Sequence, residues 1–431
     1  GAYQGRSLTE HEQAIAATWS KVLRLAHPIG PADTFMRLGG NSLMAMSVCA
    51  AVGRLIGRRI LPSSLLLDPT LECFAAESSP SQTSLSNTVT ESLALLPQQL
   101  RFWFNVQLRG ADDGNHILWA ARLHGRVNLE AAVAAMRCVF DRHEMLRAKM
   151  VDSDPPSITI ANFVAAPLAF ESVARLPEVL TPQHLPASLR EPFDLCDGPL
   201  LRAAILSGPE DDRLVMVCHH IIADARSCEV ILHDFDRAYA SIVLDGAQPQ
   251  LDAPPSFAQA VTRLQTASDQ VREDASSYWR KALDGSVTVL NLPGLSVLEP
   301  SRTVTSIRKS LKLNEPLRKS LFEFCSLKGF SPTAVFLAAY SLVLCRHVGE
   351  NDVTIGMPTS LREAGEDDEL VAPLLNVLPV RCRLPAEGDF LALCRHATLA
   401  IAGALDHADL PFEDILAPVN PVRASGRHPL F

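Results

Sequence analysis

A serine- and threonine-rich stretch divides this sequence into two unequal parts. Residues Glu77–Ser92, ESSPSQTSLSNTVTES, include almost no apolar side chains. A segment of that composition cannot bury enough surface to fold by itself, so it predicts a linker. The whole chain of 431 residues is also too long for one ordinary hydrophobic core. We therefore expect a small unit over residues 1–77, a linker over 78–92 and a large body that begins at Leu93.

The composition is that of a globular protein and disfavours two classes of partner. Hydrophobic residues make up 47% of the chain and charged residues 20%, which is typical of globular proteins. The net charge of −9, together with the lack of a long basic run, disfavours nucleic acids and anionic membranes as partners.

Cysteine usage and apolar segments indicate the cell compartment. The ten cysteines form no CxxC pairs, which is typical of reduced thiols inside a cell. The amino terminus has no signal-peptide pattern. The most apolar segment, Thr333–Cys345, is too short to cross a bilayer and predicts a buried helix. We expect a cytoplasmic protein without a membrane partner.

The small unit is predicted to be helical and the large body to be mixed. Thr9 and Glu12 form a capping-box pattern, and apolar residues that include Trp19 follow at helical spacing. In the body, runs such as LVMVC and DVTIGM predict strands, whereas LEAAVAAMRCVFDRH predicts a helix. The body is therefore expected to be of the α/β class.

The stretch GGNSL contains a candidate attachment residue. Two glycines permit a tight turn and place Ser42 at the start of a predicted second helix. Backbone N–H groups and the helix dipole favour a negative group at that position. From the residues alone, an ordinary helix N-cap is the preferred interpretation of Ser42.

The stretch HHIIAD contains the candidate chemistry of the body, and three interpretations of it compete. A metal site is disfavoured, because the adjacent histidines His219 and His220 leave a strand toward opposite faces. A structural role suits His219, whose ring would be buried and hydrogen-bonded. A catalytic role suits His220, which would lie on a loop past the strand, where a neutral imidazole can accept a proton from an amine.

The small unit resembles a known family of carrier domains. The stretch DTFMRLGGNSL resembles the attachment motif of peptidyl carrier proteins in nonribosomal peptide synthetases, and the resemblance covers about residues 1–77. It implies a small four-helix-bundle carrier with 4′-phosphopantetheine covalently attached to Ser42. It also implies an upstream adenylation domain and a phosphopantetheinyl transferase as partners.

The large body resembles condensation domains of the same synthetases. HHIIADARS resembles their HHxxxD signature, and further motifs follow the expected order: LLPQQLRFWF, DRHEMLRAKM, IGMPTSLRE, PLLNVLPVR, HADLPFEDIL and VRASGRHPLF. The resemblance implies an α/β domain of two lobes that each resemble chloramphenicol acetyltransferase. These lobes would span residues 93–262 and 263–431, and the second lobe is expected to be incomplete.

The resemblance also implies a reaction and roles for individual residues. A donor thioester on Ser42 would be transferred to the amine of an acceptor on another peptidyl carrier domain. In the signature His219, His220 and Asp224, His220 would orient or deprotonate that amine. Asp224 would be structural and paired with an arginine, with Arg362 as the first candidate and Arg147 as the second.

Three other functions stay open at this point. A terminal condensation-like domain would cyclise and release its peptide instead of elongating it. A catalytically silent domain would only recruit tailoring enzymes, although the intact histidines argue against this. An HxxxxD acyltransferase that uses His219 and Asp224 would act on a soluble acceptor, and the attached carrier argues against it.

Overall fold

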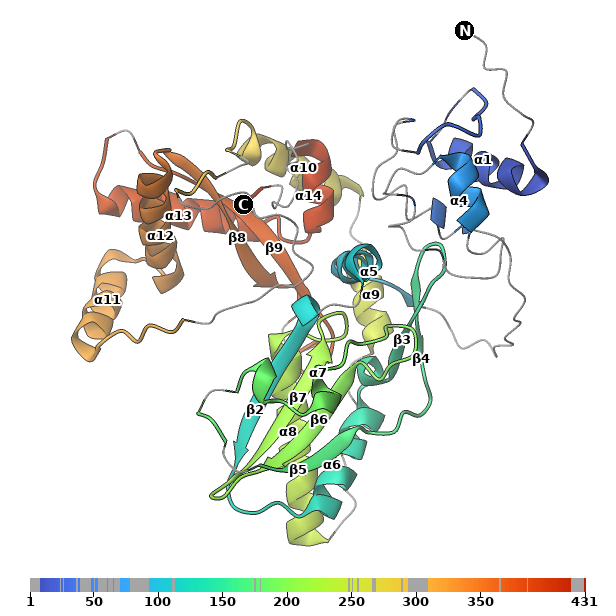
Figure 1. Cartoon of the computed structure of the whole chain (residues 1–431). Helices are drawn as coiled ribbons and strands as arrows, with labels where there is room; N and C mark the ends of the chain where they lie inside the picture. The colour runs from blue at the N-terminus through green and yellow to red at the C-terminus, as the bar shows by residue number, and fades with distance from the viewer. Residues whose placement is uncertain are drawn as a thin grey trace. The chain divides into compact units, whose positions relative to one another are not determined.

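The chain divides into two compact units in the computed structural model (Figure 1). The first unit comprises Gly1–Val261 and Glu369–Pro373, and the second comprises Thr262–Asp368 and Leu374–Phe431. The structure describes residues 8–23, 25, 27–35, 38, 48–49, 51–52, 60, 65, 70–77, 93–110, 113–173, 176–178, 180–246, 249, 251–253, 256–265, 269–287, 290–293, 309–363, 366–385, 387–419 and 430–431. The predicted linker at 78–92 lies outside these residues, and the predicted domain boundaries stay predictions.

The amino-terminal region is helical, as predicted. Helices α1 (Glu10–Leu23) and α4 (Leu71–Glu77) surround a small core in which the Trp19 ring contacts Phe35 edge-on, with centroids 5.3 Å apart. The predicted capping box is confirmed at the start of α1. Thr9 N–H donates to Glu12 Oε2 at 2.8 Å, and Glu12 N–H donates to Thr9 Oγ1 at 3.2 Å.

The centre of the first unit is a four-stranded sheet with the order β2-β7-β6-β5 (Figure 1). Its strands are β2 (His116–Leu123), β5 (Leu168–Ser172), β6 (Leu201–Ser207) and β7 (Asp212–His219). Only β5 and β6 are parallel. Strands β6 and β7 are buried along almost their whole length, which is typical of strands covered on both faces.

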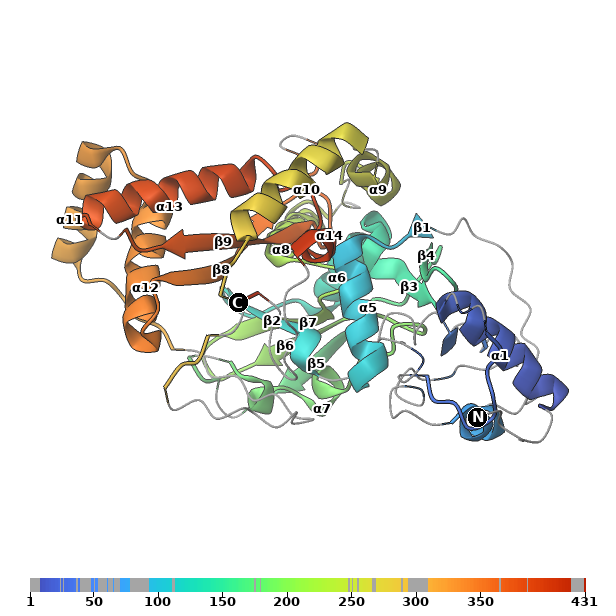
Figure 2. The same ribbon diagram turned by 90° about the horizontal axis from the view of Figure 1, so that it is seen from above.

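Helices α6 (Leu129–Arg142) and α8 (Ala225–Ala240) pack against each other on one face of this sheet (Figure 2). A smaller sheet has the order β1-β4-β3. The remaining elements of this unit are α5 (Pro97–Arg109), α6 (Leu129–Arg142), α7 (Ala187–Arg190), α8 (Ala225–Ala240), β1 (Leu93–Ala94), β3 (Ala148–Val151), β4 (Ser157–Ile160), η1 (Asp113–Asn115), η2 (Glu144–Arg147), η3 (Pro182–His184) and η4 (Ser241–Asp245), together with α9 (Phe257–Gln265), which continues into the second unit.

The second unit consists of a two-stranded antiparallel sheet with helices around it. Its strands are β8 (Asp352–Ser360) and β9 (Leu375–Arg383), and its helices are α10 (Asp269–Leu283), α11 (Glu315–Lys328), α12 (Pro332–Val348), α13 (Phe390–Leu405) and α14 (Phe412–Val419). Buried residues of the sheet, such as Val353 and Leu378, share one core with Trp279 of α10.

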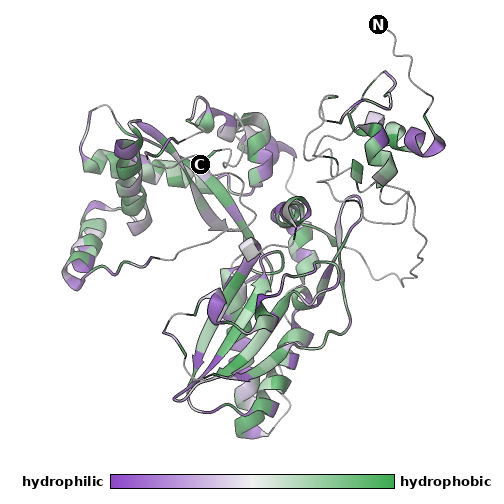
Figure 3. Ribbon diagram, in the orientation of Figure 1, coloured by the Kyte–Doolittle hydropathy of each residue, from purple (hydrophilic) through white to green (hydrophobic). Residues whose placement is uncertain are grey.

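The prediction of a buried helix at Thr333–Cys345 is correct for only one face of α12. Residues of that face, such as Ala338 and Ser341, are fully buried, but Phe336 and Tyr340 are about half exposed. Figure 3 shows that most of α12 is hydrophobic. In the described part of the chain no single helix is long and apolar enough to span a membrane, although α11 and α12, bent by 107°, meet the criteria of length and composition as a pair.

Candidate active site

The HHIIAD stretch forms the connection between β7 and α8, as the sequence pattern predicts. The backbone N–H of His219 donates to Leu200 O at 2.9 Å, and that of His220 donates to Asn115 O at 2.8 Å. The following apolar residues of the loop are fully buried. The loop is thus held on both sides before α8 begins, and the two histidines occupy fixed positions.

His219 is placed as a neutral, enclosed residue. Its side chain is buried, and Nδ1 accepts a hydrogen bond from Ile221 N–H at 3.1 Å. Burial lowers the pKa of His219 to about 3, and the neighbouring rings of His116 and His220 act in the same direction. The Phe193 ring also meets it edge-on. These contacts support a structural role for His219.

His220 is half-buried and carries the candidate chemistry. The Phe102 ring of α5 stacks on its imidazole, with centroids 4.8 Å apart and an angle of 17° between the planes. Burial lowers the pKa of His220, and the charge of Arg101 acts in the same direction. The backbone of Ala223 and the carboxylate of Asp224 oppose this shift without reversing it. The imidazole is therefore neutral near pH 7 and able to accept a proton.

Two adjacent glutamines at the start of α5 hold the site together. Gln99 Nε2 donates to Ile221 O at 2.9 Å, and its Oε1 accepts from Leu96 N–H at 3.0 Å. Gln98 Nε2 donates to Pro373 O at 3.0 Å. The motif LLPQQLRFWF contains both glutamines and Phe102, but none of the three was predicted to belong to the site. Two amides and an aromatic ring on one amphipathic helix are the signal that could have found them.

Asp224 serves as the N-cap of α8. Its Oδ1 accepts from Ser227 N–H at 2.8 Å, and the Ser227 hydroxyl lies 2.8 Å from the same oxygen. Asp224 is 5% exposed and Ser227 is fully buried. Ser227 also contacts Ala372, which belongs to the short segment Glu369–Pro373. This arrangement supports the structural role predicted for Asp224.

The two arginines predicted as partners of Asp224 both contact backbone carbonyls. Arg147 Nε donates to Phe140 O at 3.0 Å. Arg362 belongs to the second unit, where its Nη1 donates to Asp367 O at 2.8 Å. The pairing of either arginine with Asp224 stays a prediction.

The DRHEMLRAKM stretch anchors the end of α6 to α8. His143 Nε2 and Arg142 Nη1 both contact the buried carboxylate oxygen Oδ2 of Asp234, the former at 2.7 Å. Burial opposes ionisation of Asp234, but hydrogen bonds from His143 and Arg142 hold its pKa below the ordinary value. Arg142 also forms an ion pair with Glu369. The sequence did not indicate this network, because its members are far apart along the chain.

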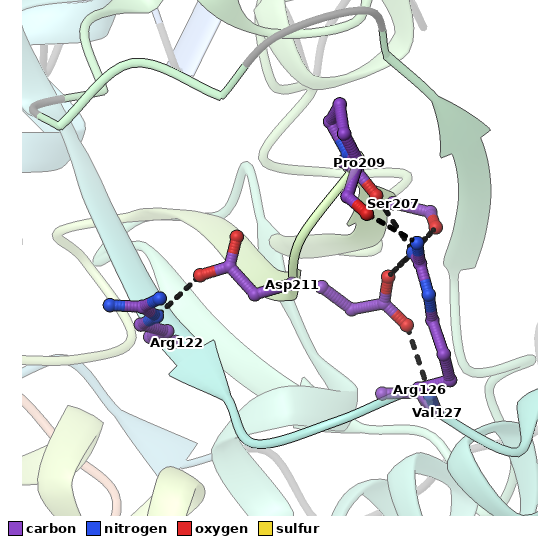
Figure 4. Close-up of polar contacts among 8 residues, drawn as sticks. Arg122, Arg126, Val127, Ser207, Pro209 and Asp211 are labelled. Atoms are coloured by element: carbon purple, nitrogen blue, oxygen red, sulfur yellow. Dashed lines mark hydrogen bonds and ion pairs between the residues drawn. The ribbon is translucent and has the colours of Figure 1, made fainter.

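A second polar cluster lies where the turn between β6 and β7 meets the chain after β2 (Figure 4). The Arg126 guanidinium donates to Ser207 Oγ, Pro209 O and Asp212 Oδ1, each at 2.9 Å. Asp212 Oδ2 also accepts from Val127 N–H at 2.9 Å. An open pocket of about 510 Å³ adjoins these residues. Because the arginine and the carboxylate pair with each other, the cluster closes the turn and indicates a structural role.

Two further predictions concern the carrier and metals. Ser42, the predicted attachment residue, lies outside the described residues. Across the parts of the chain that the structure describes, no group of three or more His, Cys, Asp or Glu side chains is arranged to hold a metal ion.

Comparison with protein families identifies the chain. The condensation-domain family matches residues 89–431. The chain belongs to this family. The phosphopantetheine attachment site family matches residues 13–77. These two matches confirm the predicted order of carrier and condensation domain, and they confirm that the chain has a phosphopantetheine attachment site.

Curated relatives of this condensation-domain chain are peptide synthetases. Malpinin synthetase of Mortierella alpina is 29% identical over 447 residues, and tyrocidine synthase 2 of Brevibacillus parabrevis is 26% identical over 438 residues. The two alignments cover 98% and 100% of this chain but only 6% and 12% of the respective relative. The chain is therefore the carrier and condensation region of a nonribosomal peptide synthetase, and it spans only a small part of the length of these relatives.

Solved structures confirm the predicted fold class. The X-domain from teicoplanin biosynthesis is similar with a TM-score of 0.69 and 27% identity, over 80% of this chain and 77% of that one. The first condensation domain of the CDA synthetase gives a TM-score of 0.63 at 16% identity, over 76% of this chain and 79% of that one, which is a likeness of fold alone. The chain thus combines a helical carrier region with an α/β condensation domain of the chloramphenicol-acetyltransferase type.

Proposed function

We propose that this chain forms a peptide bond between two substrates that are presented as thioesters on carrier domains. The donor acyl group is held on the chain's own carrier through Ser42. The acceptor is the amine of an aminoacyl group on a separate carrier domain, so the reaction elongates a peptide. The boundaries 1–77, 78–92, 93–262 and 263–431 for carrier, linker and two lobes belong to the same proposal.

The observation that carries the proposal is the placement of His220. In the reaction, the acceptor amine attacks the thioester carbonyl carbon, a C–N bond forms, the C–S bond breaks and the donor thiol leaves with the proton that the amine loses. A neutral imidazole, fixed at its backbone by Asn115 and stacked on Phe102, is suited to orient that amine or to take its proton. Holding both reactants in place supplies much of the rate acceleration.

His219 and Asp224 support His220 rather than react. His219 is enclosed and neutral, and Asp224 caps α8 immediately after the loop. A carboxylate in a buried position is costly unless it is paired, so Arg362 or Arg147 is proposed to contribute to its stabilisation. Both roles leave His220 as the residue that contacts the substrate.

Ser42 is proposed to carry 4′-phosphopantetheine, which supplies the thiol that bears the acyl group. The proposal rests on the GGNSL turn and on the family match over residues 13–77. The described part of the carrier is consistent with it. Trp19, Phe35 and Phe74 are fully buried, so α1 and α4 form a packed scaffold on either side of Ser42 in the sequence. An upstream adenylation domain and a phosphopantetheinyl transferase are the partners that this role requires.

The test loads the carrier and varies the acceptor. The protein is incubated with coenzyme A and a broad phosphopantetheinyl transferase, and its intact mass should increase in the parent but not in Ser42→Ala. A peptidyl group is then loaded, and a separate aminoacyl carrier is either offered or withheld. Elongation predicts a longer peptide on the acceptor carrier. A free ring formed without any acceptor would support terminal cyclisation instead.

A second candidate function is recruitment of an accessory enzyme. The X-domain from teicoplanin biosynthesis, which is 27% identical to this chain, has been solved as a complex with OxyB. A comparable docking role for this chain predicts no peptide bond when both thioesters are present. The elongation assay therefore separates the two candidates.

A further inference from the structure

Asn115 presents a buried polar group without a partner next to the candidate active site. The residue is 9% exposed, and in the described part of the chain no group accepts a hydrogen bond from its Nδ2 atom. The other buried asparagine among the described residues, Asn376, is satisfied on both sides of its amide. Its Nδ2 donates to two carbonyls and its Oδ1 accepts from two N–H groups. Of these two buried asparagines, Asn115 is thus the one whose amide nitrogen lacks an acceptor.

An unpaired buried donor is costly, so its presence calls for a physical explanation. Removing such a group from water without a hydrogen bond opposes folding, and most buried polar groups in native proteins are paired. A donor that is unpaired in the protein alone is explained if a ligand supplies the acceptor.

The strand register places Asn115 beside His220. His116 pairs with His219 in the antiparallel ladder between β2 and β7, and the pairing continues one step further because His220 N–H donates to Asn115 O at 2.8 Å. This backbone hydrogen bond thus holds Asn115 next to His220, at the point where the ladder between β2 and β7 ends.

The chemistry of the two side chains is complementary. The amide nitrogen has two N–H donors and no acceptor, whereas the neutral imidazole can accept a proton. In the proposed reaction, the amine loses a proton while the thioester oxygen gains negative charge. An imidazole suits the first event and an amide N–H suits the second.

We propose that Asn115 Nδ2 donates a hydrogen bond to the carbonyl oxygen of the donor thioester. This inference rests on the proposed condensation function. As the amine attacks, the C–N bond forms and the carbonyl π electrons move to that oxygen, where Asn115 stabilises them. They return when the C–S bond breaks and the thiol leaves with the amine proton. Asn115 would then be a second catalytic residue, joined to His220 by a backbone hydrogen bond at the end of the β2–β7 ladder.

The test compares Asn115→Ala and Asn115→Asp with the parent in three measurements. Both variants should lower kcat by roughly 100-fold with little change in KM, as expected when one donor to a developing oxyanion is lost. The infrared C=O stretch of a ¹³C-labelled thioester loaded on Ser42 should lie lower in the parent than in either variant. Because no hydrogen bond within the protein is lost, Asn115→Ala should keep the parent melting temperature.

A matched control separates this role from a structural one. Asn128 caps α6 through its side-chain oxygen, so Asn128→Ala should lower the melting temperature without moving the C=O stretch. If the parent elongates peptides while Asn115→Ala keeps the parent kcat and the parent stretch, the role of Asn115 is wrong and the proposed function stands. If the parent itself forms no product, the proposed function is what fails.

Discussion

The hydroxyl of Ser227 lies 2.8 Å from Asp224 Oδ1 and 3.0 Å from the carbonyl oxygen of Ala372. It also accepts hydrogen bonds from the backbone N–H groups of Asp224, at 3.2 Å, and of Ala372, at 3.1 Å. A hydroxyl has one proton and two lone pairs, so these contacts use its whole capacity. Ser227 therefore joins the loop that carries His220 to the segment Glu369–Pro373.

Ser227→Ala should destabilise the protein by about 2–4 kcal/mol, because two buried N–H groups lose their acceptor at once. Urea unfolding measures this free energy. The matched control is Asn128→Ala, which removes a single helix-cap hydrogen bond and should cost about 1 kcal/mol. If Ser227→Ala lowers the free energy of unfolding by no more than Asn128→Ala does, Ser227 does not join these segments.

Replacement of Asp224 should lower stability and activity together. Asp224→Ala removes the cap of α8 and leaves buried donors unpaired, with an expected loss of about 2–3 kcal/mol. Asp224→Asn keeps an acceptor at the cap and should stay close to the parent in melting temperature. If Asp224→Ala instead melts like the parent but has no turnover, the structural assignment is wrong.

Double-mutant cycles test the predicted pairing of Asp224 with an arginine. Asp224→Asn is combined with Arg362→Gln in one cycle and with Arg147→Gln in another. A coupling free energy near zero in both cycles would show that neither arginine is the partner of Asp224.

The stability of the protein should depend on pH through His219. Its pKa is about 3 in the folded chain against an ordinary value of 6.5, so only the unfolded chain takes up this proton as the pH falls below 6.5. The neutral His219 therefore stabilises the folded chain fully above pH 6.5, and this stabilisation is lost as the pH falls. The free energy of unfolding should decrease by about 2 kcal/mol between pH 7 and pH 5. Urea unfolding at the two pH values measures the loss.

His219→Asn is the control for this pH dependence. It keeps an acceptor for Ile221 N–H but does not titrate, so its stability should fall less between pH 7 and pH 5. All other titrating groups are common to both proteins. If the free energy of unfolding falls by the same amount between pH 7 and pH 5 in the parent and in His219→Asn, the pH dependence does not come from His219.

Local sequence patterns predicted the parts of this structure that depend on neighbouring residues. The capping box of Thr9 and Glu12 needs only the backbone between them, and it forms as expected. The placement of His220 directly after a strand also follows from an apolar run that ends in polar residues. In both cases the interacting groups lie within a few residues of each other.

Contacts between distant segments could not be predicted in the same way. Nothing in the pattern around Asp224 distinguishes a helix cap from a paired carboxylate, because Asp suits both roles. The contact of Ser227 with Ala372 and that of Arg142 with Glu369 join residues far apart in the chain. The unpaired amide nitrogen of Asn115 and the backbone contact of this residue with His220 likewise appear only in the folded chain.

The most direct test of the account is the rate of peptide transfer in the parent and in His220→Ala. Donor peptide is loaded on Ser42 in both proteins, an aminoacyl-loaded carrier is added, and mass spectrometry follows the peptide on the acceptor. We predict that His220→Ala loads Ser42 as fully as the parent but transfers the peptide at least roughly 100-fold more slowly. Transfer at the parent rate with both thioesters present would contradict the catalytic role of His220.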